Sequence, residues 1–484
     1  MSSSRVLNSL FFPESVALVG VSANPAGWGG TSFLQRLKKR GYSGRLYPVN
    51  PKATEVEGLK CYPDVKSIPE PPDHVIIATA APAVPQILRD CIVGNVKNVH
   101  IFSSGFSETG EEEGKKLDEE ITAIIKNSDL RVVGPNCMGI WVPASKLCAW
   151  GAEPKGLGSL AFVSQSGGHG EYISELGQSL GIYFSKIISF GNARGLQAVD
   201  FLEYLETDPD TKMIACYFEG MKDGNRITQL IKRINRTKPV FVWKGGLTPS
   251  GAQAVSSHTG SLAGEERIWK AFYAQTGAVP VGSLEEVIDT AMVFQYLKPT
   301  AGRRTLLMGG GGGNSVALAD ICGREGLEVP RITDQTRQEL NKFIRLAGNS
   351  TRNPLDIWSV QEDPDAFKKA FDLTLADPNI DVAIMEKQIM WDDDDQEHME
   401  RHRKSDGFMV EYCHHNASGK PIVIAVTAMA NMEGPASYRA RLLTRYATSG
   451  IPTYSTTVNA ARALSRFVAY HEFQAKAKQA NQAM

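Results

Sequence analysis

Short apolar runs recur along this chain, and most of them end in glycine or in small polar residues. A short continuous apolar run with such an ending is typical of a buried parallel β-strand, because a half-exposed strand alternates apolar and polar positions instead. Segments with helical periodicity separate the runs, so the pattern predicts an α/β protein with doubly wound parallel sheets. We expect strands at 15–20, 44–50, 74–79, 98–102, 131–133, 159–163, 213–218, 239–244, 305–308, 382–385 and 421–426, and helices at 31–40, 170–180, 265–272, 315–325 and 363–375.

The length of 484 residues is enough for two to four domains. A polar stretch at 299–304 has the composition of a linker and precedes a fresh series of strands. We expect three domains, at 1–143, 144–300 and 301–484.

The first strand leads into a glycine-rich turn at 20–30 and then into a helix, an arrangement that presents backbone N–H groups to phosphate. The second strand ends in Asn50-Pro51-Lys52, where an NAD-dependent enzyme carries an acidic residue for the ribose. A lysine there favours a ligand with an additional phosphate, such as NADP or coenzyme A. The alternative is a solvated lysine at a strand end.

The loops after the other strands of this region also consist of small residues, at 80–83, 103–106 and 134–139. In a doubly wound sheet these loops gather at the carboxyl edge, where ligands bind. Cys137 lies in the last of them, but no histidine stands beside it in the sequence. We therefore interpret it as a packed loop cysteine rather than a nucleophile.

In the middle of the chain, a strand runs into Ser164, Gln165, Ser166, Gly167 and Gly168 at the start of a helix. Hydroxyls and glycines at a helix start form an anion site, through free N–H groups and the positive end of the helix dipole. We interpret the next residue, His169, as part of the helix surface or core.

Two further residues have candidate chemistry. Glu219 ends the strand at 213–218, where a carboxylate can orient an imidazole; the alternative is a salt bridge with Lys222 or Arg226. His258 lies among hydroxyls and glycines at 256–264, which we expect to be a loop. Imidazole is a competent nucleophile near neutral pH. The alternative is a histidine that only caps the following helix.

Taken in order, these segments resemble the NDP-forming acyl-CoA synthetases, relatives of succinyl-CoA synthetase, and most closely the α subunits of ADP-forming acetyl-CoA synthetases. The segments that carry the resemblance are 20–22, 50–52, 134–137, 164–168, 218–220 and 257–261. The resemblance implies a Rossmann-like CoA-binding domain at 1–143, a flavodoxin-like domain with a phosphohistidine loop at 144–300, and a flavodoxin-like CoA-ligase domain at 301–484.

The resemblance also implies a reaction, in which acyl-CoA and phosphate give an acyl phosphate that phosphorylates a histidine, and the histidine passes its phosphate to ADP. His258 would be that histidine, Glu219 its partner, and 164–168 the phosphoryl-binding segment. The residues implied for coenzyme A are Gly20, Ser22, Asn50, Lys52, Ala81, Pro82, Ser104, Gly105, Asn136 and Cys137. We find no segment for an ATP-grasp domain, so we expect a separate β subunit that carries ADP or ATP and Mg²⁺, in an α2β2 assembly.

Composition narrows the class of protein further. The formal net charge of −1 gives no electrostatic reason to expect nucleic acid or an anionic membrane. Seven scattered cysteines without a CxxC pair indicate neither a disulfide framework nor a zinc site, and they suit a reducing cytoplasm. No apolar stretch approaches the roughly 18 residues of a membrane span.

The acidic run Asp392–Asp395 is interpreted as a solvated loop, so we expect no metal on this chain. In the five-glycine turn at 309–313, a structural role and a phosphate site are equally compatible with the sequence.

Two other functions remain open from the sequence. One is a CoA-binding regulatory or scaffold protein that has lost catalysis. The other is an NADP-dependent oxidoreductase based on the first domain, which leaves His258 and the last domain unexplained.

Overall fold

The structure is a computed structural model of the chain. It describes all residues except 1–6, 23–28, 222, 260–264, 301, 358–359, 361–362, 390–395, 429–432 and 483–484. The contacts between residues divide the chain into two compact units. The first unit holds 1–178 and 182–284, and the second holds 179–181 and 285–484.

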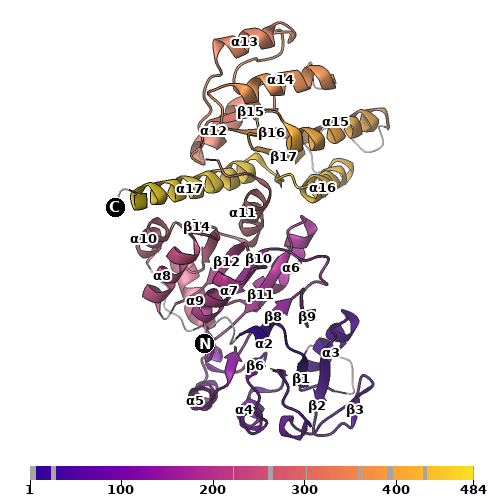
Figure 1. Cartoon of the computed structure of the whole chain (residues 1–484), viewed down its shortest axis with the longest axis vertical. Helices are drawn as coiled ribbons and strands as arrows, with labels where there is room; N and C mark the ends of the chain where they lie inside the picture. The colour runs from indigo at the N-terminus through magenta and orange to yellow at the C-terminus, as the bar shows by residue number, and fades with distance from the viewer. Residues whose placement is uncertain are drawn as a thin grey trace. The chain divides into compact units, whose positions relative to one another are not determined.

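The first sheet of the first unit is parallel throughout, with the strand order β2-β1-β5-β6-β7 (Figure 1). Because β2 and β5 lie on opposite sides of β1, the sheet has a topological switch point between β1 and β5, the place where ligands bind in such sheets. This part of the chain contains α2 (Asn8–Phe11), β1 (Ser15–Val19), α3 (Gly30–Lys39), β2 (Arg45–Val49), β3 (Glu55–Val56), β4 (Leu59–Lys60), β5 (His74–Ile77), α4 (Val84–Val93), β6 (Asn98–Ile101), α5 (Glu112–Lys126) and β7 (Arg131–Val133). β3 and β4 pair with each other as a separate antiparallel sheet.

The second sheet has the order β14-β13-β12-β10-β11-β8-β9. β8 is antiparallel to both of its neighbours, β11 and β9, and the other neighbouring strands are parallel to one another. Its switch point lies between β10 and β12. Its elements are β8 (Gly139–Val142), β9 (Leu147–Cys148), β10 (Leu160–Ser164), α6 (Gly167–Ser179), β11 (Phe184–Ser189), α7 (Ala198–Thr207), β12 (Met213–Phe218), α8 (Gly224–Ile234), β13 (Val240–Lys244), α9 (Pro249–Thr259), α10 (Glu266–Thr276) and β14 (Val279–Pro280).

The third sheet, in the second unit, is parallel with the order β15-β16-β17-β18, and Leu355 extends it through a bridge to Met308 on the far side of β15. Its switch point therefore lies between β15 and β16. The unit contains α11 (Leu284–Tyr296), β15 (Thr305–Met308), α12 (Gly313–Arg324), α13 (Asp334–Asn341), α14 (Pro364–Ala376), β16 (Val382–Ile389), α15 (Gln396–His415), β17 (Ile422–Ala428), α16 (Glu433–Thr448), β18 (Thr453–Tyr454) and α17 (Thr457–Gln482).

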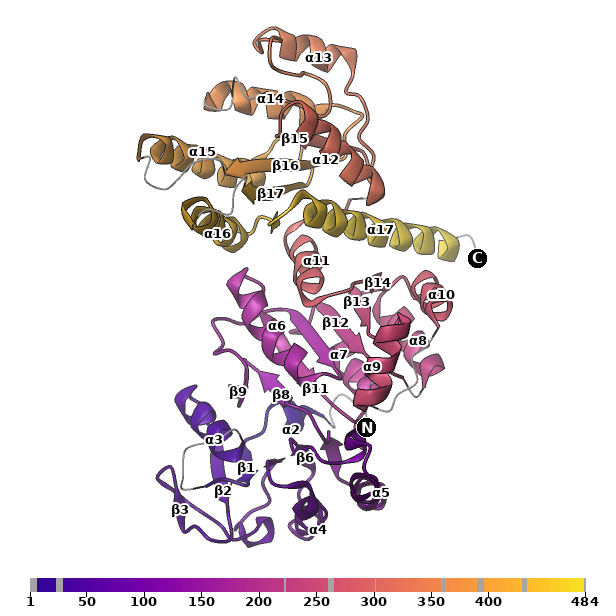
Figure 2. The same ribbon diagram turned by 180° about the vertical axis from the view of Figure 1, so that it is seen from behind.

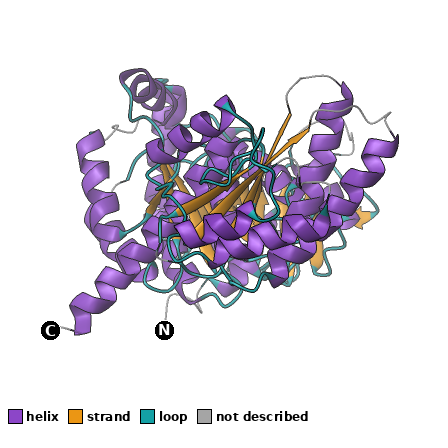
Figure 3. Ribbon diagram, turned by 90° about the horizontal axis from the view of Figure 1, so that it is seen from above, coloured by secondary structure: helices purple, strands orange, loops and turns teal. Residues whose placement is uncertain are grey.

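Helices cover both faces of the strands (Figure 3). In the third sheet this follows from the alternation of side chains along each strand. Met385 of β16 packs with α14, α15 and α16, whereas Ile384 packs on the other face with α11, α12 and α17 (Figure 2). Both faces are buried, which explains why the strands are continuous apolar runs in the sequence.

The predicted fold class is confirmed, and every expected strand and helix overlaps an observed one. The stretch predicted as a loop around His258 is corrected in part, because the backbone up to Thr259 belongs to α9. The predicted division into three domains stays a prediction. The chain enters the second sheet at β8, which begins at Gly139, before the expected boundary at 143.

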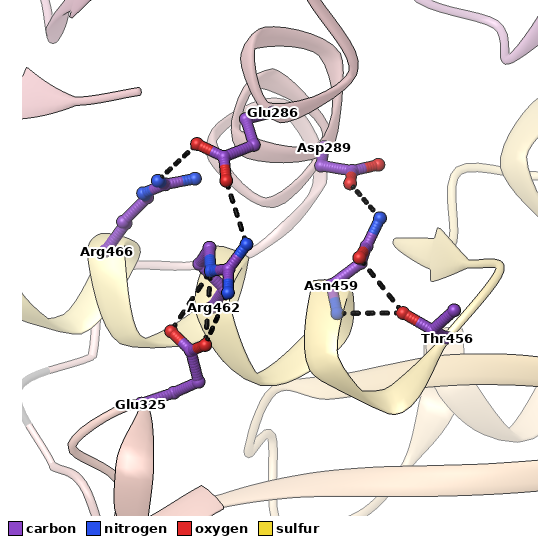
Figure 4. Close-up of polar contacts among 7 residues, drawn as sticks. All are labelled: Glu286, Asp289, Glu325, Thr456, Asn459, Arg462 and Arg466. Atoms are coloured by element: carbon purple, nitrogen blue, oxygen red, sulfur yellow. Dashed lines mark hydrogen bonds and ion pairs between the residues drawn. The ribbon is translucent and has the colours of Figure 1, made fainter. Parts of the chain in front are cut away.

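A polar network holds α11 against the C-terminal helix of the second unit (Figure 4). Arg462 of α17 donates to Glu286 of α11 at 2.9 Å and to Glu325, which follows α12, at 2.8 Å. Arg466 donates to the other oxygen of Glu286 at 2.6 Å. Asn459 donates to Asp289 of α11 at 2.8 Å. Arg462 thereby links three helices that cover one face of the sheet.

Replacing Arg462 by methionine should loosen α11. The change keeps much of the apolar stem but removes a donor from Glu325 and one of two arginine donors from Glu286, which keeps Arg466. We expect this loss to cost about 1–3 kcal/mol. Amide hydrogen exchange in α11 should therefore become faster. The matched control is Arg324→Met, because Arg324 meets Asp320 only at 3.9 Å on an exposed surface and such pairs contribute little. Equal exchange rates in the two variants would contradict the role given to Arg462.

The packing of α11 should also depend on pH through Asp289. Burial raises the pKa of this carboxyl to about 7, although the hydrogen bond from Asn459 opposes the shift. In an unfolded chain the pKa of this carboxyl is about 3.9. Between these two pKa values the native state therefore retains a proton that the unfolded state releases. Stability is therefore greatest at low pH and decreases as the pH rises toward 7.

Asp289→Asn should remove this dependence. Exchange in α11, corrected for the intrinsic rate at each pH, should be faster at pH 8 than at pH 5 in the wild type and nearly equal in the variant. A wild-type profile that does not change with pH would refute the assignment.

Candidate active site

The loops at the carboxyl edge of the first sheet are tied to one another. The Asn50 side chain donates to the carbonyl of Val21, so the end of β2 holds the turn after β1. Gly20 has φ +95°, and a Cβ there would lie 2.3 Å from the carbonyl oxygen of Ala78. Only glycine therefore allows β1 and β5 to approach so closely at the switch point.

The remaining loops continue this edge. Ser103 donates to the carbonyl of Thr79 at 2.6 Å and accepts from its N–H at 3.2 Å. The Asn136 N–H donates to the carbonyl of Ser103 at 3.0 Å. A Cβ on Gly105 would lie 3.1 Å from that of Ala81. The structure thus brings the loops after β1, β2, β5, β6 and β7 to one edge, with all the residues predicted to bind coenzyme A.

Several features of this edge fit an anionic, polar ligand such as coenzyme A. The Thr79 hydroxyl is buried at the switch point and has no hydrogen-bond partner among the described residues. Pro82 and Ser104 are exposed, as are Ser22 and Lys52, and the Lys52 N–H donates to Asn50 at 2.8 Å. This edge of the sheet therefore has a buried hydroxyl, that of Thr79, without a partner among the described residues, and an exposed cation, Lys52.

Cys137 is buried, and its thiol contacts the carbonyl of Ile101 at 3.7 Å. Burial raises its pKa far above the usual range of a thiol. The thiolate is the reactive form, so this environment supports the interpretation as a packed residue. Its backbone carbonyl oxygen lies 3.0 Å from Nε2 of His100, so Cys137 has a structural role at this edge of the sheet.

The predicted phosphoryl-binding segment lies at the switch point of the second sheet. The hydroxyl of Ser164, the last residue of β10, accepts from the Ser166 N–H at 3.0 Å and donates to the Ser166 carbonyl at 2.8 Å. A Cβ added to Gly168 would meet no atom within 4 Å. The start of α6 is therefore shaped by Ser164 and open at Gly168, as an anion-binding helix terminus requires.

Glu219 follows β12 directly across the switch point. The side-chain carbonyl oxygen of Gln165 accepts from the backbone N–H of Glu219 and, at 3.0 Å, from the backbone N–H of Gly220. Tyr217 donates to the Glu219 carboxylate at 3.2 Å. The Lys244 ammonium, at the end of β13, donates to the Glu219 carbonyl at 2.9 Å. Gln165, predicted to bind phosphate, thus holds the backbone that carries the carboxylate.

The alternative salt bridges of Glu219 have different outcomes. Arg226 pairs with Glu203 at 2.7 Å instead, and 51% of the Arg226 side chain and 24% of the Glu203 side chain are exposed. Lys222 lies outside the described residues. Glu219 itself is buried, with 5% of its surface exposed.

His169 belongs to this cluster, which the sequence alone did not indicate. Its ring stacks on Trp243 with 4.7 Å between centroids and meets Tyr217 edge-on at 4.4 Å. Burial lowers its pKa, and the nearby Glu219 opposes the shift. The only available signal was its place in the first turn after the Ser-Gln-Ser-Gly-Gly segment.

The backbone of His258 lies in the last turn of α9, after β13, but its side chain is outside what the structure describes, as are residues 260–264. The acidic run Asp392–Asp395 is also outside. The residues after it, from Gln396, form α15, and the loop expected at Asp392–Asp395 stays a prediction.

The five-glycine turn before α12 is already capped by the chain's own acids. The Gly312 N–H donates to Asp356 at 3.3 Å, and Asn314 donates to Glu386 at 2.7 Å. Burial raises the pKa of Glu386. Two carboxylates beside this helix start disfavour a further anion, so the structure favours the structural role over a phosphate site.

No group of three or more metal-ligating side chains occurs within the described ranges. Of the helices that the structure describes, none is both long and apolar enough for a membrane crossing.

Three family models match the chain. A CoA binding domain matches 14–143, a succinyl-CoA ligase-like flavodoxin domain matches 157–294, and a ligase-CoA domain matches 305–464.

Individual relatives match over most of the chain. The α subunit of ADP-forming acetate–CoA ligase II of Pyrococcus furiosus is 36% identical over 78% of this chain and 82% of that protein. The α subunit of acetate–CoA ligase I of the same organism is 32% identical over 98% of this chain and 99% of that protein. A solved structure of acetyl-coenzyme A synthetase 1 of Ca. Korarchaeum cryptofilum with phosphate and ADP has a TM-score of 0.83 and 28% identity, over 98% of both chains.

The link between Gln165 and Glu219 can be tested by substitution. Gln165→Leu removes the acceptor of two backbone N–H groups, and a lost hydrogen bond of this kind costs about 1–3 kcal/mol. Amide exchange at Glu219 and Gly220 should accelerate by roughly one to two orders of magnitude. Gln178→Leu is the control, since buried Gln178 accepts from the Lys155 N–H at 2.6 Å in another part of the unit. Unchanged exchange at 219 and 220 would show that Gln165 does not hold this backbone.

Proposed function

Because the chain belongs to the NDP-forming acyl-CoA synthetase family, we propose that it is the α subunit of an ADP-forming acyl-CoA synthetase. The reaction interconverts acyl-CoA, ADP and phosphate with a carboxylic acid, coenzyme A and ATP. The observation that carries the proposal is the meeting of the α6 start with Glu219 at one switch point, with Gln165 bonded across it. An anion site and a carboxylate that can serve an imidazole thus lie side by side.

The first step joins the two sheets of the first unit functionally. Coenzyme A would bind at the edge formed by the loops after β1, β2, β5, β6 and β7, where Lys52 can face a phosphate. Attack of inorganic phosphate on the thioester carbonyl forms the acyl–oxygen bond, breaks the acyl–sulfur bond and releases the thiolate of coenzyme A. The products are free coenzyme A and an acyl phosphate.

In the second step an imidazole nitrogen of His258 attacks the phosphorus of the acyl phosphate, and the carboxylate leaves. The resulting phosphohistidine then gives its phosphoryl group to ADP, which restores the histidine and forms ATP. Glu219 would accept the second ring N–H of His258 and thereby make the imidazole a better nucleophile. The α6 start would hold the phosphoryl oxygens through backbone N–H groups, which stabilise charge without competing for the phosphorus.

ADP and its Mg²⁺ would bind to a partner. Both P. furiosus relatives are named as α subunits, and none of the three matched domains is a nucleotide-binding ATP-grasp domain. We therefore expect a β subunit with that domain, in an α2β2 assembly. The seven cysteines are free thiols, six of them buried, which suits an enzyme of the reducing cytoplasm.

The deciding experiment is phosphorylation of the purified chain with its β partner and ATP labelled in the γ-phosphate. The wild type should acquire label that is acid-labile and base-stable, as a phosphohistidine is. His258→Ala should acquire none, and Glu219→Gln should acquire label at least about tenfold more slowly, the loss expected when a charged hydrogen bond of about 1.5–3 kcal/mol is weakened.

The matched control for these substitutions is His415→Gln, since His415 is exposed and its ring contacts the carbonyl of Glu411 and the ring of His414, both in its own helix. It should label as the wild type does. Label that persists in His258→Ala would place the nucleophile elsewhere. Coenzyme A binding without any label, beside a partner proven active, would favour the CoA-binding scaffold instead.

A further inference from the structure

His169 has a place in the candidate active site that packing alone does not explain. Its backbone N–H donates to the Ser166 hydroxyl at 3.3 Å, which fixes the residue in the first turn of α6. Its Nδ1 is buried and has no hydrogen-bond partner among the described residues. Buried polar atoms are nearly always bonded. A half-buried ring with one unsatisfied nitrogen, at the start of the helix to which the proposed function assigns a phosphoryl group, indicates a ligand-binding group.

The rings around His169 come from adjacent strands in register. Ser164, Tyr217 and Trp243 are paired neighbours at the ends of β10, β12 and β13, so their side chains share one face of the sheet. His169 covers this face, stacked on Trp243 and edge-on to Tyr217. The stacking orients the imidazole, because rotation of the ring would break the contact with Trp243.

The charged groups near the ring compete over its protonation. Burial favours neutral imidazole, whereas Glu219 favours the cation. The face of Trp243 also favours a cation above it. Tyr217 stays neutral, since burial raises its pKa beyond the ordinary range. The Lys244 ammonium is bonded to the carbonyls of Glu219 and Gly245. Burial and Glu219 thus act on the imidazole in opposite directions, and a bound anion would add to the side that favours the cation.

We propose that His169 binds the phosphate or phosphoryl group held at the start of α6, and that it takes up a proton from solvent as the anion binds. This inference rests on the proposed function, which assigns a phosphoryl group to the same segment. The imidazolium then donates an N–H to a phosphoryl oxygen, while Glu219 and Trp243 stabilise its charge. The one bond that forms is the N–H bond between the imidazole and the solvent proton, and it breaks when the anion leaves and the proton returns to solvent.

A merely structural histidine would behave differently from this one. A packing residue can be replaced by phenylalanine, which keeps the stack on Trp243, with little effect on phosphate. A phosphate-binding residue loses affinity for phosphate in the same variant, and the loss depends on pH.

The first measurement is tryptophan fluorescence of the full chain during titration with inorganic phosphate. An imidazolium stacked on indole quenches its emission, so the wild type should show saturable quenching. The response should be absent in His169→Gln, which cannot be protonated, and in Trp243→Phe, which lacks the reporter. His415→Gln should respond as the wild type does. This measurement needs neither turnover nor the β partner.

The second measurement is the KM for phosphate in acyl-CoA cleavage with the β partner. His169→Phe should raise it about tenfold at pH 6.5, the size expected for one charge-assisted hydrogen bond. The KM values for acyl-CoA and ADP should stay unchanged. The ratio between variant and wild-type phosphate KM should fall toward one as the pH rises to 8.5, because the imidazole is then neutral in both the free and the bound protein.

A phosphate KM in His169→Phe within about twofold of the wild type at every pH, or quenching that persists in His169→Gln, would overturn the proposal while leaving the proposed function intact. Failure of the proposed function has a different signature, namely no acid-labile label on the wild type with an active partner. In that case the fluorescence titration still decides whether His169 binds phosphate.

Discussion

The hydrogen bonds from the backbone of Glu219 and Gly220 to Gln165 are the constraint on which the candidate active site depends. A switch point separates the loops of two neighbouring strands, because one chain segment leaves toward each side of the sheet. Without a link across the gap, the carboxylate after β12 and the helix start after β10 would be free to move apart. The side-chain carbonyl of Gln165 joins them, and the Glu219 carboxylate is thereby kept beside the proposed anion site.

The polar groups at this edge are withdrawn from water, so each must find a partner within the protein. Lys244 meets this need with two backbone carbonyls, and Glu219 meets part of it with Tyr217. The aromatic rings of Tyr217, Trp243 and His169 pack against one another at the same place. An electrostatic interaction is stronger among partly buried groups than in solution, which favours the anion binding proposed for this site.

Most strands could be predicted because both faces of each sheet are covered, which makes a strand a continuous apolar run. The run of β11 is hidden by Lys186, a residue that no local pattern places in a core. It is fully buried and pairs with Asp208 at 2.7 Å, so a partner distant in sequence makes the strand possible. The helix α9 was predicted as a loop because glycine and serine, which are poor helix formers, surround His258.

The candidate site was predictable wherever its residues directly follow a strand, since the edge of a parallel sheet collects such residues. Gln165 and His169 show the limit of this argument. Gln165 was assigned to phosphate, but its carbonyl bonds to a loop 54 residues further along the chain. His169 was interpreted as surface or core, because only the register of β12 with β13 sets two aromatic rings against it. Pairings between distant segments decide both side chains, and sequence periodicity does not record them.

The crossing of β8 into the second sheet has a consequence for modular evolution and for protein engineering. A gene cut between the matched domains, after residue 143, would leave β8 on the first fragment and β9 on the second, although the two strands pair with each other. The first fragment would then present an unpaired strand, and the second would have lost the strand that covers β11. Exchange of the CoA-binding module between relatives should therefore join the chains before Gly139, so that the donor supplies the loops and the recipient keeps its own sheet intact.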